Sequence, residues 1–187
     1  MNRKLVFAVA LMTFAPVALR AQETTTNTRI NAAFETAMSA GIPVELLQSK
    51  VAEGRAKGVS EARIAAAVEA RLQGLTRAAE AFERAHVEST STADLSVAAD
   101  AIEAGISENT LIKVTRTAPA ERRAVAIATL TGLVQLGHAS EHALARVSAV
   151  VRSNAELGRL NADVASQLQA RGGVNGTVRG AGNVRIN

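Results

Sequence analysis

The 187-residue sequence contains no cysteine, tryptophan or tyrosine, and it has only three prolines and four phenylalanines. Without cysteine the chain can form no disulfide, no thiolate metal ligand and no thiol nucleophile, which removes several classes of enzyme. Two phenylalanines lie in the N-terminal apolar run, so that only Phe34 and Phe82 follow it. Proteins that bind single-stranded nucleic acid stack bases on aromatic side chains. We therefore expect no nucleic-acid partner.

A strongly basic surface is missing as well, although the formal net charge is +4. Three of the 21 basic residues, Arg3, Lys4 and Arg20, fall within residues 1–21, where no acidic residue occurs. The other 18 basic residues are matched by 17 acidic ones, which is close to neutrality. The charge distribution therefore gives no footprint for DNA or RNA.

The first 21 residues have the pattern of a secretory signal peptide, because two basic residues precede an apolar run from Leu5 to Leu19. This run is shorter than the roughly 20 residues that a membrane-spanning helix needs. Ala21 is small enough for the last position before cleavage. Leu19 is larger than the residue usually found two places earlier, so an uncleaved N-terminal membrane anchor is the alternative. We predict a signal peptide over residues 1–21 and an exported chain, periplasmic or extracellular.

After this segment the sequence predicts helices and no strands. Residues 22–28 are polar and rich in threonine, and we expect a disordered leader there that ends in a helix cap. Ile30, Phe34 and Met38 then recur at four-residue spacing, which makes an apolar stripe along one face of a helix.

A three-residue unit, glycine followed by Ile or Val and then by Ser or Pro, occurs three times. The copies begin at Gly41, Gly58 and Gly105. Glycine favours the left-handed residue at a helix end, whereas Ser and Pro favour a helix start. An apolar residue four positions after each Ser or Pro can contact the Ile or Val as a hydrophobic staple. We expect tight turns between packed helices, with a looser copy from Gly137 to a cap at Ser140.

The expected fold class is all-α, an irregular bundle or a short superhelical stack of about seven to eight helices within residues 29–171. A Ser/Thr-rich linker at 89–92 divides this domain into two halves, and Ser91 with Asp94 resembles a capping box. The stretch 119–136 is apolar on nearly all sides, which predicts a central helix. Five residues around Gly41 recur 64 positions later around Gly105, which suggests internal duplication.

The C-terminal tail, residues 172–187, has five glycines and no acidic residue. We predict disorder for it, and a small hairpin turning at Asn175-Gly176 is the alternative. With Arg171 the tail carries three arginines, which would attract anionic lipid or polysaccharide only weakly.

Histidines are the first candidates for chemistry, and there are three of them. His138 and His142 are four residues apart, a spacing that places two imidazoles on one helix face for metal binding. The cap expected at Ser140 puts His138 in the turn, and no cysteine can serve as a further ligand. We predict exposed histidines, His86 included, and neither a metal site nor a cofactor. His138 and His142 are the candidates if a metal binds.

Acidic pairs are the second candidates. Glu35 with Glu45, or Asp94 with Asp100, resemble the paired carboxylates of glycoside hydrolases. Because sugar-cleaving sites usually also hold aromatic platforms, we expect these acids to be solvated.

A basic pair, Arg122 and Arg123, would suit an acidic partner, and we expect a solvated helix face. No Gly-x-Ser-x-Gly nucleophile turn occurs, and we predict no catalytic residue. The preferred hypothesis is a non-enzymatic exported module that binds a protein or peptide in a groove between its helices, or acts as a scaffold. The alternatives are an envelope protein that contacts a membrane or polysaccharide through residues 172–187, and a metal binder or enzyme of unknown type. Oligomeric state is left open.

Overall fold

The computed structural model describes residues 16–87 and 89–172, and its side chains from residue 25 to 171. This part of the chain is helical throughout, without strands, which confirms the predicted all-α fold. The eight helices are α1 (Pro16–Ser39), α2 (Glu45–Ala56), α3 (Glu61–Ala85), α4 (Thr92–Glu103), α5 (Glu108–Thr117), α6 (Ala120–Gln135), α7 (Ser140–Val150) and α8 (Asn154–Gly172). The expected signal region before Pro16 and the tail after Gly172 lie outside the described residues.

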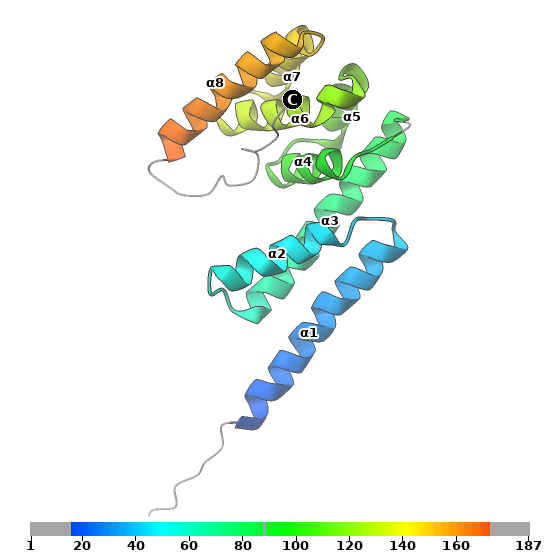
Figure 1. Ribbon diagram of the computed structural model, residues 1–187, viewed down its shortest axis with the longest axis vertical. Helices are drawn as coiled ribbons and strands as arrows, with labels where there is room; N and C mark the ends of the chain where they lie inside the picture. Colours follow the sequence, from blue (N-terminus) through cyan, green and yellow to red (C-terminus); the bar gives the residue numbers. More distant parts are fainter. Residues whose placement is uncertain (1–15, 88, 173–187) are drawn as a thin grey trace, which may run out of the picture.

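Two helices occupy the centre of the fold. Helix α3 packs against α1, α2, α4 and α5, and helix α6 packs against α4, α5, α7 and α8. The helices follow one another along the long axis, with α1 and α2 toward one end and α7 and α8 at the other (Figure 1). The predicted central position of α6 is confirmed, and α3 has the same role. The two halves joined by the 89–92 segment therefore pack directly on each other.

Every predicted glycine turn is present. Gly41, Gly58, Gly105 and Gly137 all have positive φ, between 65° and 93°. In the first turn Gly41 N donates to Met38 O, and Ile42 N donates to Ala37 O at 2.8 Å. The other three turns repeat this pair of hydrogen bonds, which satisfies carbonyls that a helix end leaves free. These hydrogen bonds join residues within each turn, so they do not test whether the two segments arose by internal duplication, which stays a prediction.

A fifth turn has the same hydrogen bonds without a glycine. His86 has a φ of 54°, and it donates from N to Glu83 O at 3.0 Å. Val87 N donates to Phe82 O at 3.4 Å. Helix α3 therefore ends at Ala85, whereas the apolar residues that recur after Ser60 in the sequence predict a helix from Ser60 to about Glu88. The difference arises because histidine does not mark a left-handed residue as glycine does.

One prediction at the start of the chain is wrong, and the predicted signal peptide stays a prediction. Residues 22–28 are helical, as part of α1, and are not a disordered leader. Thr26 is 4% exposed, and α1 packs on α3; tertiary packing of this kind stabilises a helix whose own propensity is poor. The cleavage position predicted after Ala21 lies inside α1. In the described part of the chain, no helix is both long and apolar enough to cross a membrane.

Helix starts are a mixture of confirmed and corrected predictions. Ser91 and Asp94 form the predicted capping box, and Ser107 and Ser153 accept hydrogen bonds from the backbone three residues on. Ala139 rather than Ser140 occupies the cap of α7.

Alanine makes up about a third of the buried hydrophobic residues in the described core, and larger residues make up the rest. Leu47, Leu111 and Ile127 are fully buried, and Ala37, Ala78 and Ala98 are buried with them. Small side chains let helix backbones approach closely. The described helices can therefore pack closely on one another.

Candidate functional site

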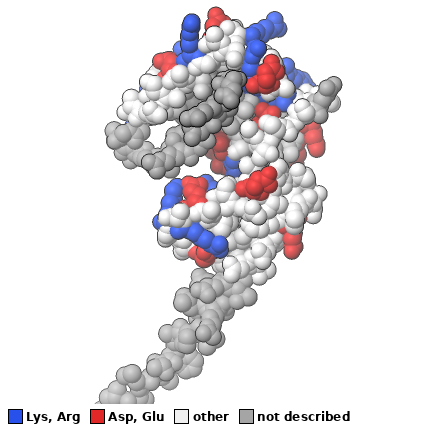
Figure 2. Space-filling view, viewed as in Figure 1, with Lys and Arg blue, Asp and Glu red and all other residues white. Residues whose placement is uncertain are grey.

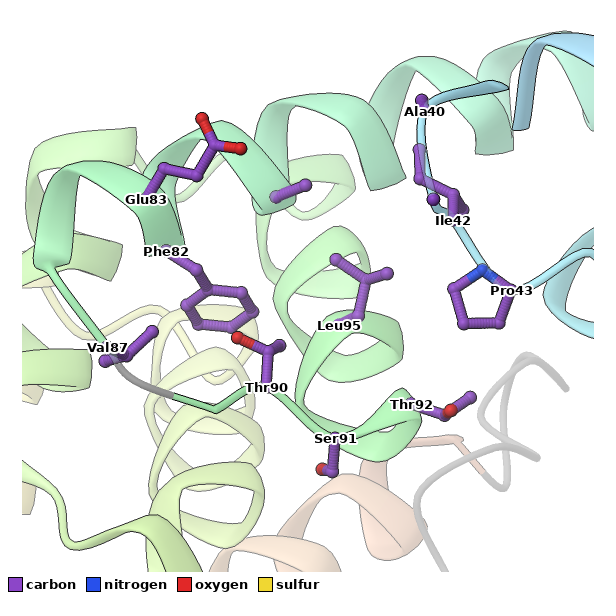
Figure 3. A pocket seen from close by; sticks show the side chains of 12 residues that line it. Ala40, Ile42, Pro43, Phe82, Glu83, Val87, Thr90, Ser91, Thr92 and Leu95 are labelled. Carbon is purple, nitrogen blue, oxygen red and sulfur yellow. The ribbon is translucent and has the colours of Figure 1, made fainter. Parts of the chain in front are cut away.

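A partly apolar groove lies at the junction of three segments of the described surface and is called here the junction groove (Figure 3). Its walls come from the α1–α2 connection, the last turns of α3 and the start of α4. Phe82 and Leu95 form its floor, with Ile42 and Pro43 on the connection beside them. The volume is about 250 Å³.

Helix ends position each wall of the junction groove. The left-handed Gly41 turns the chain so that Ile42 is buried at 4% exposure. The left-handed His86 ends α3 and directs the chain over the groove floor. The capping box of Ser91 and Asp94 fixes the first turn of α4. The groove thus depends on backbone hydrogen bonds at the ends of α1 and α3 and on bonds between backbone and side chains at the start of α4.

The chemistry of the junction groove is that of a binding surface. Small-molecule pockets usually have volumes of roughly 300 to 1,000 Å³, and this groove is smaller. Its rim carries hydroxyl groups of Thr90, Ser91 and Thr92, all exposed. An apolar floor with a polar rim is the usual anatomy of a protein contact. One or two apolar side chains of a partner would fit this space.

The surrounding surface is otherwise polar. Among the described residues, Met38 on the last turn of α1 is the one large hydrophobic residue that is exposed, at 60%. Positive and negative side chains are interspersed on the face shown in Figure 2. The described surface therefore has no broad apolar patch around the groove.

The predicted histidine candidates do not come together into a ligand set. Among the described residues, no group of three or more His, Asp or Glu side chains is placed to hold a metal ion. His138 follows the left-handed Gly137 and its backbone N donates to Leu133 O at 3.1 Å. His142 lies on α7, and both side chains are exposed.

The predicted acidic pair on α4 is divided between two arginines. Asp94 is buried and lies 3.4 Å from Arg123 Nη1, whereas Asp100 lies 2.6 Å from Arg71 Nη1. Arg71 also donates to the carbonyl and hydroxyl oxygens of Ser96. Each carboxylate therefore ties α4 to a central helix, and the pair is not arranged around one shared space. Glu35 and Glu45, the other pair, are exposed.

The prediction of a solvated Arg122-Arg123 face is wrong. Arg123 is only 6% exposed, with hydrogen bonds to Ser89 O and Asp94. Arg122 donates to the carbonyl oxygens of Val151 and Arg152 at the end of α7. These contacts could not be predicted, because nothing local in the sequence indicates that α4 and α7 lie opposite the start of α6.

Further arginines bind carbonyl oxygens at helix ends. Arg116 donates to Arg84 O at 2.7 Å, and Arg171 donates to Leu136 O at 2.9 Å. A cation at a helix C-terminus interacts favourably with the helix dipole.

Carboxylates with altered pKa values lie outside the junction groove. Hydrogen bonds from Arg84 and then Arg77 lower the pKa of Glu108. Lys57, then Lys50, lowers the pKa of Glu53, and Arg29 lowers that of Glu69. All three shifts favour the charged form, as expected for structural ion pairs. A comparison of the chain with protein-family models, curated proteins and solved structures finds no match.

Proposed function

We propose that this protein is a non-enzymatic, exported helical module that binds a peptide segment of a protein partner in the junction groove. The observation that carries the proposal is the groove itself, an apolar floor of Phe82 and Leu95 beneath a rim of hydroxyl groups. A peptide would place an apolar anchor residue on this floor. The N-terminal pattern of residues 1–21 supports export, and a cell-envelope partner is consistent with it.

The size of the groove supports a peptide over a metabolite. Binding energy in protein contacts is concentrated in a few anchor side chains within small desolvated pockets. A groove of about 250 Å³ provides one such pocket. Its walls are held by helix-end hydrogen bonds, so little ordering is required on binding, which favours affinity.

The test is selection of random displayed peptides on the purified protein, followed by affinity measurement with a groove-blocking variant. Ala79 lines the groove and is half-buried, so Ala79→Arg should fill the space and weaken binding of selected peptides at least about tenfold. Ala66→Arg is the matched control, because Ala66 is an exposed residue of the same helix outside the groove.

Circular dichroism would establish that both variants keep their helix content. Selected peptides that bind Ala79→Arg as well as they bind the original protein would contradict the proposal. Failure to enrich any peptide would contradict it as well.

A further inference from the structure

A second hollow lies where the end of α3, helix α5 and the start of α6 meet, and it is called here the arginine hollow. Its volume is about 380 Å³, within the range of roughly 300 to 1,000 Å³ that is usual for small-molecule sites. The described polar residues that line it are His86, Ser89, Thr115, Arg116 and Arg123. Val87 is the residue it shares with the junction groove, and the inference does not rest on peptide binding.

Arg123 lines this hollow, and part of its guanidinium group has no hydrogen bond in the described structure. Its Nη1 donates to Ser89 O at 2.8 Å and lies 3.4 Å from Asp94 Oδ2. Its Nε is closed to solvent and has no hydrogen-bond partner among the described residues. The edge formed by Nε and Nη2 carries two parallel N–H bonds. That geometry matches the two oxygens of a carboxylate or a phosphate.

Thr115 supplies a second unpartnered group on the same hollow. The residue is 1% exposed, and its Oγ1 has no hydrogen-bond partner in the described structure. Buried polar groups are nearly always hydrogen-bonded, because the group loses its interactions with water on burial. The two residues that carry these atoms, Thr115 on α5 and Arg123 on α6, both line the arginine hollow. A single acceptor-rich ligand would satisfy both.

The charges around the arginine hollow favour a negative ligand. Arg116 is exposed and uses Nη2 to bind Arg84 O, which leaves the rest of its guanidinium group unused. Ala120, which also lines the hollow, is the first residue of α6, and the start of a helix carries partial positive charge. Asp94 is the acidic group that offsets Arg123. Among the described residues that line the hollow, none is acidic, so Arg116 and the helix start have no acidic neighbour in that set.

We propose that the arginine hollow binds a small oxyanion, a carboxylate or a phosphate group, between the Nε edge of Arg123, the hydroxyl of Thr115 and the guanidinium of Arg116. The oxyanion accepts hydrogen bonds from all three. No covalent step is involved.

The experiment is a titration of the full chain followed by nuclear magnetic resonance, with inorganic phosphate in one series and acetate in another. Sodium chloride at equal ionic strength is the control series. Saturable shifts of the Arg123 Nε–H signal and of the Thr115 and Ala120 amides are expected with the oxyanion. The series with the tighter binding identifies the preferred group, phosphate or carboxylate. Chemical-shift changes that are equal in all three series and do not saturate would overturn the proposal, because they would show that the hollow binds no oxyanion specifically.

Thr115→Val is the decisive variant, because it removes an unpartnered hydroxyl and keeps the shape of the side chain. We expect it to fold normally and to bind the oxyanion about tenfold more weakly, as the loss of one hydrogen bond to a charged group predicts. Thr117→Val is the matched control: Thr117 is exposed on the same helix, and its hydroxyl donates to Lys113 O. Equal binding by the two variants would refute the site.

Arg116→Met tests the charge, and Arg146→Met, at an exposed position of α7, controls for the lost net charge. We expect about tenfold weaker binding in the first and little change in the second. The peptide proposal is tested separately by Ala79→Arg, which should leave oxyanion binding unchanged. Thr115→Val should in turn leave peptide binding unchanged.

Discussion

Glycines within helices allow close packing at single residues, and Gly132 is the clearest case. A Cβ atom at Gly132 would overlap Val164 Cγ1 and lie 3.3 Å from Leu168 Cδ1. At Gly158, in α8, a Cβ atom would have nothing within 4 Å. Both changes to alanine gain the same helix propensity, about 1 kcal/mol. Gly132→Ala should therefore have a free energy of unfolding about 1 to 3 kcal/mol below that of Gly158→Ala, the usual cost of overpacking.

Urea unfolding followed by circular dichroism measures this difference. Equal urea midpoints for Gly132→Ala and Gly158→Ala would contradict the prediction, because α6 and α8 would then accommodate the added methyl group without loss of stability.

The left-handed residue His86 gives a second prediction at this scale. A residue with a Cβ atom loses about 1 kcal/mol or more in this conformation, and glycine holds the same position in the other four turns. His86→Gly should raise the free energy of unfolding by about 0.5 to 1 kcal/mol. Gly105→Ala, at a φ of 88° with open space around it, should lower it by a similar amount. Thermal unfolding of both variants checks the signs, and a loss of stability in His86→Gly would contradict this reasoning.

The sequence predicted the turn glycines but not the packing glycines, for a physical reason. A left-handed residue is marked by its neighbours, since Gly105 is followed by an apolar residue and a serine. The role of Gly132 depends on Val164 lying opposite, which is a tertiary fact. The same holds for Arg123, whose burial requires Ser89 and Asp94 to lie across from it.

At the scale of elements, Glu108 joins helices α3 and α5. It lies at the first position of α5, and both Arg77 and Arg84 bind its carboxylate. Its pKa is lowered from an ordinary value of 4.5. A group whose pKa is lower in the folded state adds stability above its unfolded pKa, and this stability disappears as the pH falls through the folded value.

Glu108→Gln should therefore lower the free energy of unfolding at neutral pH, by no more than about 1 kcal/mol for such partly exposed pairs. Glu45→Gln is the matched control, because Glu45 is also the first residue of a helix and controls for the helix dipole. The difference between the two variants should shrink as the pH falls below about 4. Chemical unfolding across a pH series measures it. A difference that persists unchanged in acid would show that the ion pairs are not its source.

Helix existence was more predictable than helix boundaries at this scale. The capping box at Ser91 was readable because its two partners are three residues apart. The helical state of residues 22–28 was not, since these threonines favour other conformations and only packing of α1 against α3 stabilises them. Neither hollow was predictable, because each is formed by helix ends distant in the sequence.

For the whole molecule, the arrangement around α3 and α6 determines where stability should be concentrated. Each of these helices has packed neighbours on several sides, whereas α2 packs chiefly on α3, and α7 lies toward one end. Val68, Leu75 and Ala78 of α3, and Ile127 and Leu130 of α6, are fully buried. Opening either central helix would therefore disrupt most of the bundle, whereas α2 could open locally.

Native-state hydrogen exchange should show this hierarchy directly. Amides in the middle of α3 and α6 should exchange only through global unfolding, and those of α2 and α7 through smaller local openings. Ile127→Ala leaves a cavity in α6 and should lower the global free energy of unfolding by about 2 to 5 kcal/mol. The protection of α3 amides should fall by the same amount, because both central helices pack on α4 and α5. A fall confined to α6 would mean that the two ends of the bundle unfold independently, and the shared packing on α4 and α5 would then not couple them.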